Sequence, residues 1–396
     1  MWDTVIVGAG ILGLATAREL LSRNPEARVL VLERENEIAA HQTSHNSGVV
    51  HAGIYYAPGS LKSQLCTEGR GKMYDYCDQH GIAYEKCGKI IIALDESELP
   101  KLDELERRGR ENGVPGLRRL RAEEIAEVEP HAVGVAALFS PDTGIVDFAA
   151  VARSIAAEIV SAGATIRTGV AVERLSRTRA TTVVHTSEGE IPCVRAVACA
   201  GLWSDRLAVA SGEPDDLRIV PFRGSYLKLK PQARHLVRTL IYPVPDPSLP
   251  FLGVHATKTI SGDIWLGPTA LLAPSRRAYS LRSFDRADAL STLSWPGTWK
   301  VIGRFWRTGI TELGFAARRR AFVEACARYV PALEPGHVEA GPAGIRAQAV
   351  SRDGKLLDDF AFAETEGALH VRNAPSPAAT SSLAIARMIA DRVESL

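Results

Sequence analysis

The sequence predicts a mixed α/β protein. It combines a Rossmann-like dinucleotide-binding domain, a second domain built on a discontinuous antiparallel sheet, and a helical basic subregion. Three observations favour this fold. The chain opens on an apolar strand and a glycine-rich turn, residues 218–267 hold short strands of alternating polarity, and residues 275–335 combine arginine with tryptophan in a helical pattern. At 396 residues the chain is long enough for two domains.

The opening unit has the layout of a dinucleotide site. An apolar strand at residues 4–7 leads into a Gly-x-Gly-x-x-Gly turn at residues 8–13, a helix follows, and a second apolar strand at residues 29–32 ends at Glu33. In such a unit the glycines permit a tight turn, bring backbone N–H groups to a pyrophosphate and let the helix pack on the strand. The Glu33 carboxylate would accept hydrogen bonds from a ribose diol and repel a 2′-phosphate, which disfavours NADP.

A polar loop at residues 41–48 follows this unit. Its small polar residues are poor core material, and they suit a backbone that runs past a ligand. His41 and His45 lie four residues apart, but nothing nearby completes a metal site and the composition argues against a helix. We therefore predict no metal site.

The rest of the chain alternates helices and short strands between turn signals. Helices are expected at residues 61–80, 96–112, 148–162, 202–210 and 383–393. Strands are expected at residues 89–94, 165–167, 170–175, 182–186, 194–201, 221–229, 239–244, 252–255, 264–267 and 369–371. A second strand–glycine–helix junction at residues 200–204 could meet the same cofactor as the first. The dinucleotide-binding domain is therefore assigned residues 1–85, 146–217 and 340–396, and the substrate-binding domain residues 86–145 and 218–339.

The composition is that of an ordinary globular protein. A net charge of +1 and 46% hydrophobic residues disfavour a disordered or nucleic-acid-coating chain. The six cysteines form no CxxC pair and suit free thiols in a reducing compartment. No uncharged apolar run approaches the ~20 residues that span a bilayer, and no signal peptide precedes the first strand. We expect a cytoplasmic protein, at most bound at the inner face of the membrane, and leave its oligomeric state open.

Several motifs resemble those of one group of flavoenzymes. The glycine-rich start, the loop Asn46–Gly53, the Ala200–Ser204 junction and the C-terminal helix resemble the FAD-dependent D-amino-acid-oxidase superfamily. Within it, the stretches Asn46–Lys62, Pro221–Tyr226, Leu252–His255 and Asn373–Thr380 look closest to the L-2-hydroxyglutarate oxidase/dehydrogenases. The resemblance spans essentially the whole chain, and it is weakest over residues 275–335.

The resemblance implies FAD, not NAD, as the dinucleotide. It also implies oxidation of L-2-hydroxyglutarate to 2-oxoglutarate by hydride transfer from C2 to flavin N5, with electrons passed to oxygen, a quinone or another acceptor. Some relatives attach the flavin covalently to a histidine near the position of His51; we expect a non-covalent flavin here. By position, the resemblance assigns cofactor binding to Gly8, Gly10, Gly13, Glu33, Thr43, Ser44, Asn46, Ser47, Val172, Gly201, Arg346 and Thr380.

Oxidation of a 2-hydroxy acid needs a base for the hydroxyl proton and partners for the carboxylates. Histidine has a suitable pKa, so we favour His255 as the base and His51 as an orienting or electrostatic group. A buried histidine with a purely structural role is the alternative for each. The substrate is a dianion, and arginine offers a bidentate fork for a carboxylate. The candidate substrate ligands are Arg223, Lys258 and Arg346 as cations, and Tyr55, Tyr56 and Tyr226 as hydroxyl donors.

The basic aromatic region admits two interpretations. Residues 271–320 contain ten Lys and Arg against three Asp and Glu on a nearly neutral chain. The region is either an ordinary helical subdomain or oligomer contact, or a surface over residues 275–320 that binds anionic lipid near a membrane quinone.

Two other functions remain open at this point. One is an amine or amino-acid oxidase of the sarcosine or D-amino-acid type, or a glycerol-3-phosphate dehydrogenase, on the same fold. The other is a flavin-containing assembly or binding subunit without turnover. Reduction of the flavin by a panel of hydroxy acids and amino acids would separate these possibilities.

Overall fold

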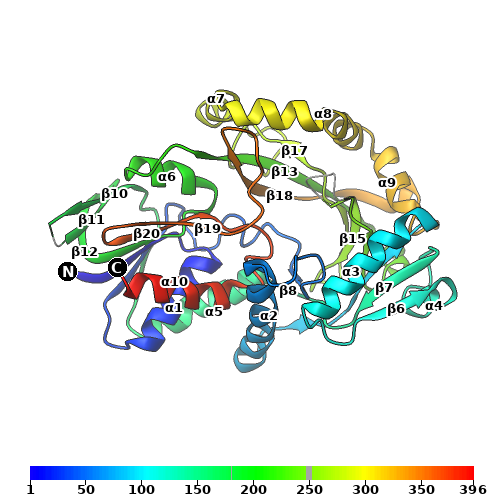
Figure 1. Cartoon of the computed structure of the whole chain (residues 1–396), viewed down its shortest axis with the longest axis horizontal. Coiled ribbons are helices and arrows are strands. Elements are labelled where there is room, and N and C mark those ends of the chain that lie inside the picture. The colour runs from blue at the N-terminus through cyan, green and yellow to red at the C-terminus, as the bar shows by residue number, and fades with distance from the viewer. Residues whose placement is uncertain (180, 247–251) are drawn as a thin grey trace.

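Two large sheets lie side by side in the computed structural model, which describes residues 1–179, 181–246 and 252–396. Figure 1 shows the first sheet beside helices α1, α5 and α10, the second sheet at the other end of the molecule, and helix α8 along the top edge. Helix α2 lies between the two halves, and the two termini lie close together (Figure 1). The mixed α/β class is confirmed.

The first sheet has eight strands and a parallel core. Its parallel strands follow the order β9-β2-β1-β12-β20, so the two strands of the glycine-rich unit occupy its centre. Strands β10, β11 and β19 extend it antiparallel. The bounds are β1 (Trp2–Val7), β2 (Val29–Leu32), β9 (Thr165–Arg167), β10 (Val172–Thr178), β11 (Thr181–Thr186), β12 (Gly189–Ala198), β19 (Ala361–Thr365) and β20 (Ala368–Asn373).

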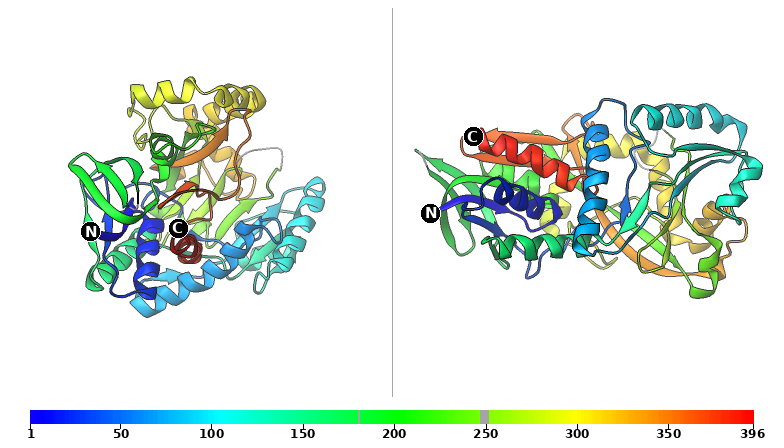
Figure 2. Two further views of the ribbon diagram at one scale, coloured as in Figure 1. Left: turned by 60° about the vertical axis from the view of Figure 1, so that its left-hand side comes forward. Right: turned by 90° about the horizontal axis from the view of Figure 1, so that it is seen from below.

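One face of this sheet carries the largest apolar core. Side chains of β1, β2 and β20 pack there against the inner faces of three helices, which lie together in the view from below in Figure 2. These helices are α1 (Ile11–Arg23), α5 (Phe148–Ser161) and α10 (Ser382–Glu394). The side chains that fill this space are mainly Ala, Val, Ile and Leu, so the hydrophobic effect fixes the helices on the sheet.

The second sheet has nine strands and is largely antiparallel. Its order is β17-β13-β16-β15-β14-β5-β7-β6, β18 pairs with β13, and β5 with β14 is the parallel pair. The bounds are β5 (Lys89–Ala93), β6 (Arg118–Arg121), β7 (Ala136–Ser140), β13 (Leu217–Leu229), β14 (Leu240–Pro243), β15 (His255–Lys258), β16 (Ile264–Gly267), β17 (Leu271–Leu272) and β18 (Val338–Ser351).

Short elements connect the two sheets. Helix α2 begins after Ser60, whose hydroxyl accepts a hydrogen bond from the Ser63 N–H, and ends before Gly81 in the left-handed region. The other bounds are α2 (Leu61–His80), α3 (Leu99–Glu111), α4 (Ala122–Val128), α6 (Ser204–Ala210), a small sheet of β3 (Val49–Val50), β8 (Gly144–Val146) and β4 (Tyr84–Glu85), and the 3-10 helices η1 (Glu96–Glu98), η2 (Gly201–Trp203), η3 (Pro231–Leu236) and η4 (Pro335–His337).

Two expectations differ from the structure. Strand β18 pairs with β13 along almost its full length, from Ser351 opposite Leu217 to Val338 opposite Leu229. The chain therefore returns to the first sheet after residue 351 and not at residue 340. The strand expected at residues 252–255 begins only at its last residue, because β15 runs from His255 to Lys258.

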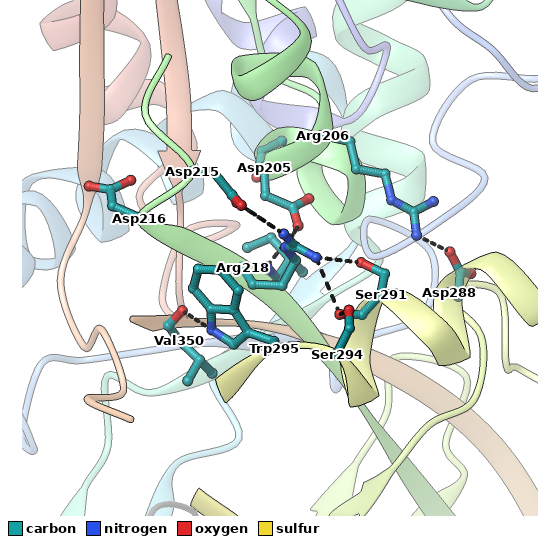
Figure 3. Close-up of polar contacts among 12 residues, drawn as sticks. Asp205, Arg206, Asp215, Asp216, Arg218, Asp288, Ser291, Ser294, Trp295 and Val350 are labelled. Carbon is teal, nitrogen blue, oxygen red and sulfur yellow. Dashed lines mark hydrogen bonds and ion pairs between the residues drawn. The ribbon is translucent and has the colours of Figure 1, made fainter. Parts of the chain in front are cut away.

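The basic subregion is helical, and its inner side is firmly attached to the second sheet. It comprises α7 (Arg286–Leu293), α8 (Pro296–Ala317) and α9 (Arg319–Ala327). Figure 3 shows Arg218 of β13 donating to the Ser291 side chain, and Trp295 donating through Nε1 to the Val350 carbonyl oxygen at 3.0 Å. Trp295 is therefore a core residue. Arg276 is also buried, in an ion pair with Asp205. Trp295 and Arg276 therefore cannot face a membrane, although the composition of the basic aromatic region suggested that they could.

Candidate active site

A cavity of about 1220 Å³ is lined by residues of both sheets. This volume exceeds the about 300–1,000 Å³ of ordinary small-molecule pockets, so a dinucleotide and a small substrate fit together. Five segments far apart in the chain line it, namely residues 7–13, 39–56, 199–207, 344–348 and 371–380. The sequence-predicted residues in its wall are Gly8, Gly10, Gly13, Glu33, Thr43, Asn46, Ser47, His51, Tyr55, Tyr56, Val172, Gly201, Tyr226, His255, Arg346 and Thr380.

The glycine-rich turn leaves no room for side chains. Gly8 has a φ of 102°, and a Cβ there would lie 2.4 Å from the Cys199 carbonyl oxygen. A Cβ on Gly13 would lie 2.0 Å from the Gly8 carbonyl oxygen, so this glycine allows α1 to pack directly on the turn. The Ile11 N–H donates to the Thr43 hydroxyl at 3.0 Å, which ties the polar loop to the start of α1. The start of α1 therefore faces the cavity with the partial positive charge of a helix N-terminus.

Glu33 ends β2 at the cavity wall. Its carboxylate accepts the Ala9 N–H at 2.8 Å and the Glu35 N–H at 3.0 Å, which fixes its direction. A carboxylate has further acceptor positions, so Glu33 can still receive the hydroxyls of a ribose. The guanidinium of Arg34, the next residue, lies 4.3 Å from the centre of the Trp203 ring and closes this end of the cavity.

The loop from residue 41 to 48 is held by its own side chains. Asn46 donates through Nδ2 to the Gln42 and Thr43 carbonyls and accepts the Gly48 N–H at 2.7 Å. Asn46 therefore shapes the loop as well as lining the cavity. Ser44 does not line it, because its side chain turns to the Ala39 carbonyl oxygen at 2.6 Å. This residue, which the sequence analysis assigned to cofactor binding, is therefore outside the wall of the cavity.

The imidazoles of the same loop are engaged with protein groups. His41 contacts Glu35 at 3.0 Å through Nε2, and its Nδ1 lies 3.2 Å from the Tyr279 hydroxyl. The described residues contain no His, Cys, Asp and Glu group arranged to hold a metal ion.

Thr380 connects the C-terminal turn to the loop that carries His51. Its hydroxyl accepts the His51 N–H at 3.1 Å and donates to the Val49 carbonyl oxygen at 3.2 Å. Burial holds the pKa of His51 well below its ordinary value, and the positive charge of Lys89 lowers it further. His51 is therefore a neutral group in the cavity wall, positioned from both ends of the chain.

His255 has the geometry of a base. Its Nδ1 lies 2.8 Å from the Gly253 carbonyl oxygen, and because a carbonyl only accepts, Nδ1 carries the proton. Nε2 is then left with a lone pair. Burial lowers the pKa of His255 to about 3, below the ordinary histidine value on which its choice as base rested, and Lys89 and Arg346 contribute in the same direction. The ring stacks on Tyr242 with the centroids 4.0 Å apart, so the imidazole is held in one orientation.

Positive charge gathers around these histidines. Arg346 of β18 lines the cavity, and burial lowers its pKa while Tyr226 opposes that change. Lys62 also lines the cavity and pairs with Asp358 at 2.7 Å. A ligand with two carboxylates would find a cation and several tyrosine side chains at this end.

Two predicted substrate ligands lie elsewhere. Arg223 is absent from the cavity wall, whereas its neighbours Phe222 and Gly224 line it, as alternation along β13 requires. The Arg223 guanidinium donates to the Ala278 carbonyl oxygen at 2.9 Å. Lys258 pairs with Glu85 at 2.6 Å and is also outside the cavity. Both cations are therefore engaged with protein groups outside the cavity wall.

The sequence interpretation also missed residues of the site. The missed residues are Lys89, Tyr242 and Lys62. Lys89 lies against the Tyr242 ring, which stacks on His255, and Lys62 forms an ion pair with Asp358. The one available signal was a lysine that opens the otherwise apolar run Lys-Ile-Ile-Ile-Ala of β5. A lysine in a fully buried strand is rare unless it is paired.

Comparison with known proteins places this geometry in a family. The model of the FAD dependent oxidoreductase family (DAO) matches residues 3–392. The chain belongs to this family. L-2-Hydroxyglutarate dehydrogenases are among its curated relatives: the mitochondrial enzymes of Nematostella vectensis and Homo sapiens are each 46% identical over 99% of this chain and cover 90% and 89% of their own lengths. The enzyme of Indibacter alkaliphilus is 42% identical over 97% of this chain and 96% of its own length.

Solved structures of the FAD dependent oxidoreductase family share the fold. The dithionite-reduced L-α-glycerophosphate oxidase of Mycoplasma pneumoniae, with FAD bound, has a TM-score of 0.81 at 22% identity and covers 100% of this chain and 94% of its own. Glycine oxidase of Geobacillus kaustophilus has a TM-score of 0.72 at 20% identity, and the match covers 100% of this chain and 95% of that structure's chain. The cofactor of the family is FAD, and the glycine-rich turn, Glu33 and the long cavity fit it.

Proposed function

We propose that the protein oxidises L-2-hydroxyglutarate to 2-oxoglutarate. The observation that carries this proposal is a neutral histidine with a free Nε2, His255, at the cationic end of a cofactor cavity. The full-length similarity to L-2-hydroxyglutarate dehydrogenases supports the choice of substrate. Amine oxidation and glycerol-3-phosphate oxidation are less well supported, because the glycine oxidase and the L-α-glycerophosphate oxidase that share the fold are 20% and 22% identical to this chain.

The chain's own residues account for substrate placement and proton removal. Arg346 binds one carboxylate, and the Tyr226 and Tyr56 side chains border the rest of the ligand. Nε2 of His255 takes the proton of the C2 hydroxyl, and the C2–O bond becomes a carbonyl as hydride leaves C2. FAD, when bound, accepts that hydride. Thr380 keeps His51 in place beside the reacting carbon, where a neutral imidazole can donate or accept one hydrogen bond.

An anaerobic titration of the purified protein tests this function. L-2-Hydroxyglutarate should bleach the flavin absorbance with one equivalent per chain, while D-2-hydroxyglutarate, glycine, sarcosine and glycerol 3-phosphate should leave it unchanged. Bleaching by an amine or by glycerol 3-phosphate alone would replace the proposal with the corresponding activity. A flavin that none of these compounds reduces would favour a binding subunit without turnover.

We also infer that the electron acceptor is a membrane quinone reached by docking on anionic lipid. Helix α8 carries an outward apolar stripe in which Trp299, Trp306, Ile310 and Leu313 are 57%, 53%, 59% and 60% exposed. Trp306, Ile310 and Leu313 are spaced by four and three residues, so they share one face of the part of α8 that follows the kink at Phe305, and Trp299 is exposed on the part before it. Leu281, Phe284 and Leu290 extend the patch toward and along α7. Exposed apolar side chains gathered on one helix are typical of a surface that contacts a protein or a membrane.

The charge around this patch selects lipid as the partner. Lys300, Arg304 and Arg307 are exposed on the same helix, and Arg318 to Arg320 follow at its end. Tryptophan at headgroup depth with arginine on phosphate is the pattern of a helix that lies in the membrane surface. In the described residues no helix is long and apolar enough to cross a bilayer, so the contact would be peripheral.

Flotation with vesicles tests the docking. The protein should float with vesicles containing phosphatidylglycerol at low salt, and the double variant Trp299→Ser/Trp306→Ser should stay in the soluble fraction. Val160→Ser on α5, where Val160 is comparably exposed, is the matched control. The double variant should keep its turnover with a soluble dye and lose it with a vesicle-bound quinone. Equal flotation of wild type and double variant would remove the membrane from the proposal, and oxygen would then be the acceptor to test.

A further inference from the structure

A lysine lies buried behind the two histidines of the site. Lys89 opens β5, where it is paired with Leu240 of β14 and Ser140 of β7, and only 2% of its surface is exposed. Burial of an ammonium ion costs several kcal/mol unless an opposite charge compensates it. Among the residues that the structure describes, no Asp or Glu forms an ion pair with Lys89, and its pKa is influenced by burial and by two thiols. An apolar side chain would suit this position better if only stability mattered.

Aromatic rings connect Lys89 to the site. Its Nζ lies 4.2 Å from the centre of the Tyr242 ring and 5.1 Å from that of Tyr55. The Tyr242 ring stacks on His255 at 4.0 Å, and Tyr55 lines the cavity. Lys89 Nζ is therefore at most about 8 Å from the centre of the His255 ring, because both groups lie against the Tyr242 ring. At this distance, and in a water-poor interior, a unit charge changes the pKa of a neighbour by about one unit or more.

We propose that Lys89 is an electrostatic positioning residue of this enzyme. Its ammonium, which lies against the Tyr55 and Tyr242 rings, gives the cavity the positive potential that a dianionic substrate requires. The carboxylates of the bound substrate would supply the negative charge that no described Asp or Glu provides to Lys89. This inference rests on the proposed function, because a ligand without negative charge would gain nothing from it.

The charge of Lys89 should depend on pH within the working range. Burial lowers the pKa of Lys89 to about 7. The titratable groups that face Lys89 keep their charge between pH 6 and 9. Burial raises the pKa values of the neighbouring hydroxyls and thiols, which belong to Tyr55, Tyr242, Cys66 and Cys87. Burial lowers the pKa values of the two histidines, His51 and His255. The ammonium is thus present below pH 7 and lost as the pH rises, and dianion binding should weaken with it.

Calorimetric binding of 2-oxoglutarate to the flavin-loaded protein tests the inference without turnover. Wild type should bind at least about tenfold more weakly at pH 8.5 than at pH 6.5, and kcat/KM for L-2-hydroxyglutarate should fall over the same range. Lys89→Met should bind weakly at both pH values. Lys89→Arg keeps its charge and should bind equally at both. Lys86→Met is the matched control, because Lys86 is a surface lysine three residues away that pairs with Asp142, and it should follow wild type.

The outcomes separate the inference from the function on which it rests. Binding by wild type that is equal at pH 6.5 and 8.5, or a Lys89→Met protein with the same pH dependence as wild type, would overturn the role of Lys89 alone. Absence of 2-oxoglutarate binding and of flavin reduction at every pH would overturn the proposed function instead. Flavin content and unfolding temperature identify a variant that has not folded; in that case the wild-type pH dependence and Lys89→Arg still decide.

Discussion

Replacement of Gly13 by alanine gives the most direct test of the cofactor site. The added Cβ would lie 2.0 Å from the Gly8 carbonyl oxygen, whereas a carbon and an oxygen in contact are about 3.3 Å apart. The Gly8 oxygen and the new Cβ at residue 13 are both held rigidly by the backbone, so neither can turn aside. Helix α1 must therefore move away from the turn by about 1 Å. Overpacking of this kind costs about 1–3 kcal/mol, and the displaced helix start no longer meets the pyrophosphate. We expect FAD affinity to fall about 100-fold, which corresponds to about 2.7 kcal/mol.

The assay is the amount of flavin that stays with the chain through gel filtration, read from its visible absorbance, together with the unfolding temperature. Gly71→Ala is the matched control. Gly71 lies inside α2, and a Cβ added there would meet no atom within 4 Å, so alanine should stabilise the helix by about 0.5–1 kcal/mol and leave the flavin in place. A Gly13→Ala protein that keeps a full complement of flavin would refute the close-packing argument for this turn.

Three further predictions concern the reaction end of the cavity. His255→Asn should lower kcat about 10²–10⁴-fold with the flavin still bound, because the base is lost; stopped-flow reduction measures it, and an unchanged rate would move the base elsewhere. Arg346→Met should lower kcat/KM for L-2-hydroxyglutarate more than tenfold, whereas Arg223→Met should change it less than twofold and lower the unfolding free energy by about 1–2 kcal/mol; the reverse result would restore Arg223 to the site. Acid precipitation should leave the yellow colour in the supernatant, and a yellow pellet would show a covalent flavin, with His51 the first residue to examine.

The sequence was a good guide wherever local chemistry decides the structure. The glycine-rich turn, the Glu33 position and the 61–80 helix depend on near neighbours, and the helix bounds follow from Ser60 at one end and Gly81 at the other. The two histidines that the sequence singled out, His51 and His255, both line the cavity, although distant residues fix their positions there. Family resemblance added the cofactor.

Features that depend on distant partners were not predictable in the same way. Strand β18 contains many Ala and Gly residues and few β-branched ones, so its pairing with β13 has no local signal. Arg223 was misplaced because a sequence shows that strand residues alternate but not which set faces the ligand. Lys89 was overlooked because its neighbours come from three separate segments of the chain.

The order of strands in the first sheet has a consequence for biosynthesis. Strand β12 pairs with β1 through Ala196 opposite Val5, and with β20 through Ala196 opposite Ala368. The parallel core around the first strand therefore stays incomplete until β20, near the end of the chain, has been synthesised. Contacts with such large sequence separation form slowly. The flavin pocket, which also needs residues 374–380, would be finished last, so a ribosome-bound chain that lacks its final thirty or so residues should remain colourless even when FAD is abundant.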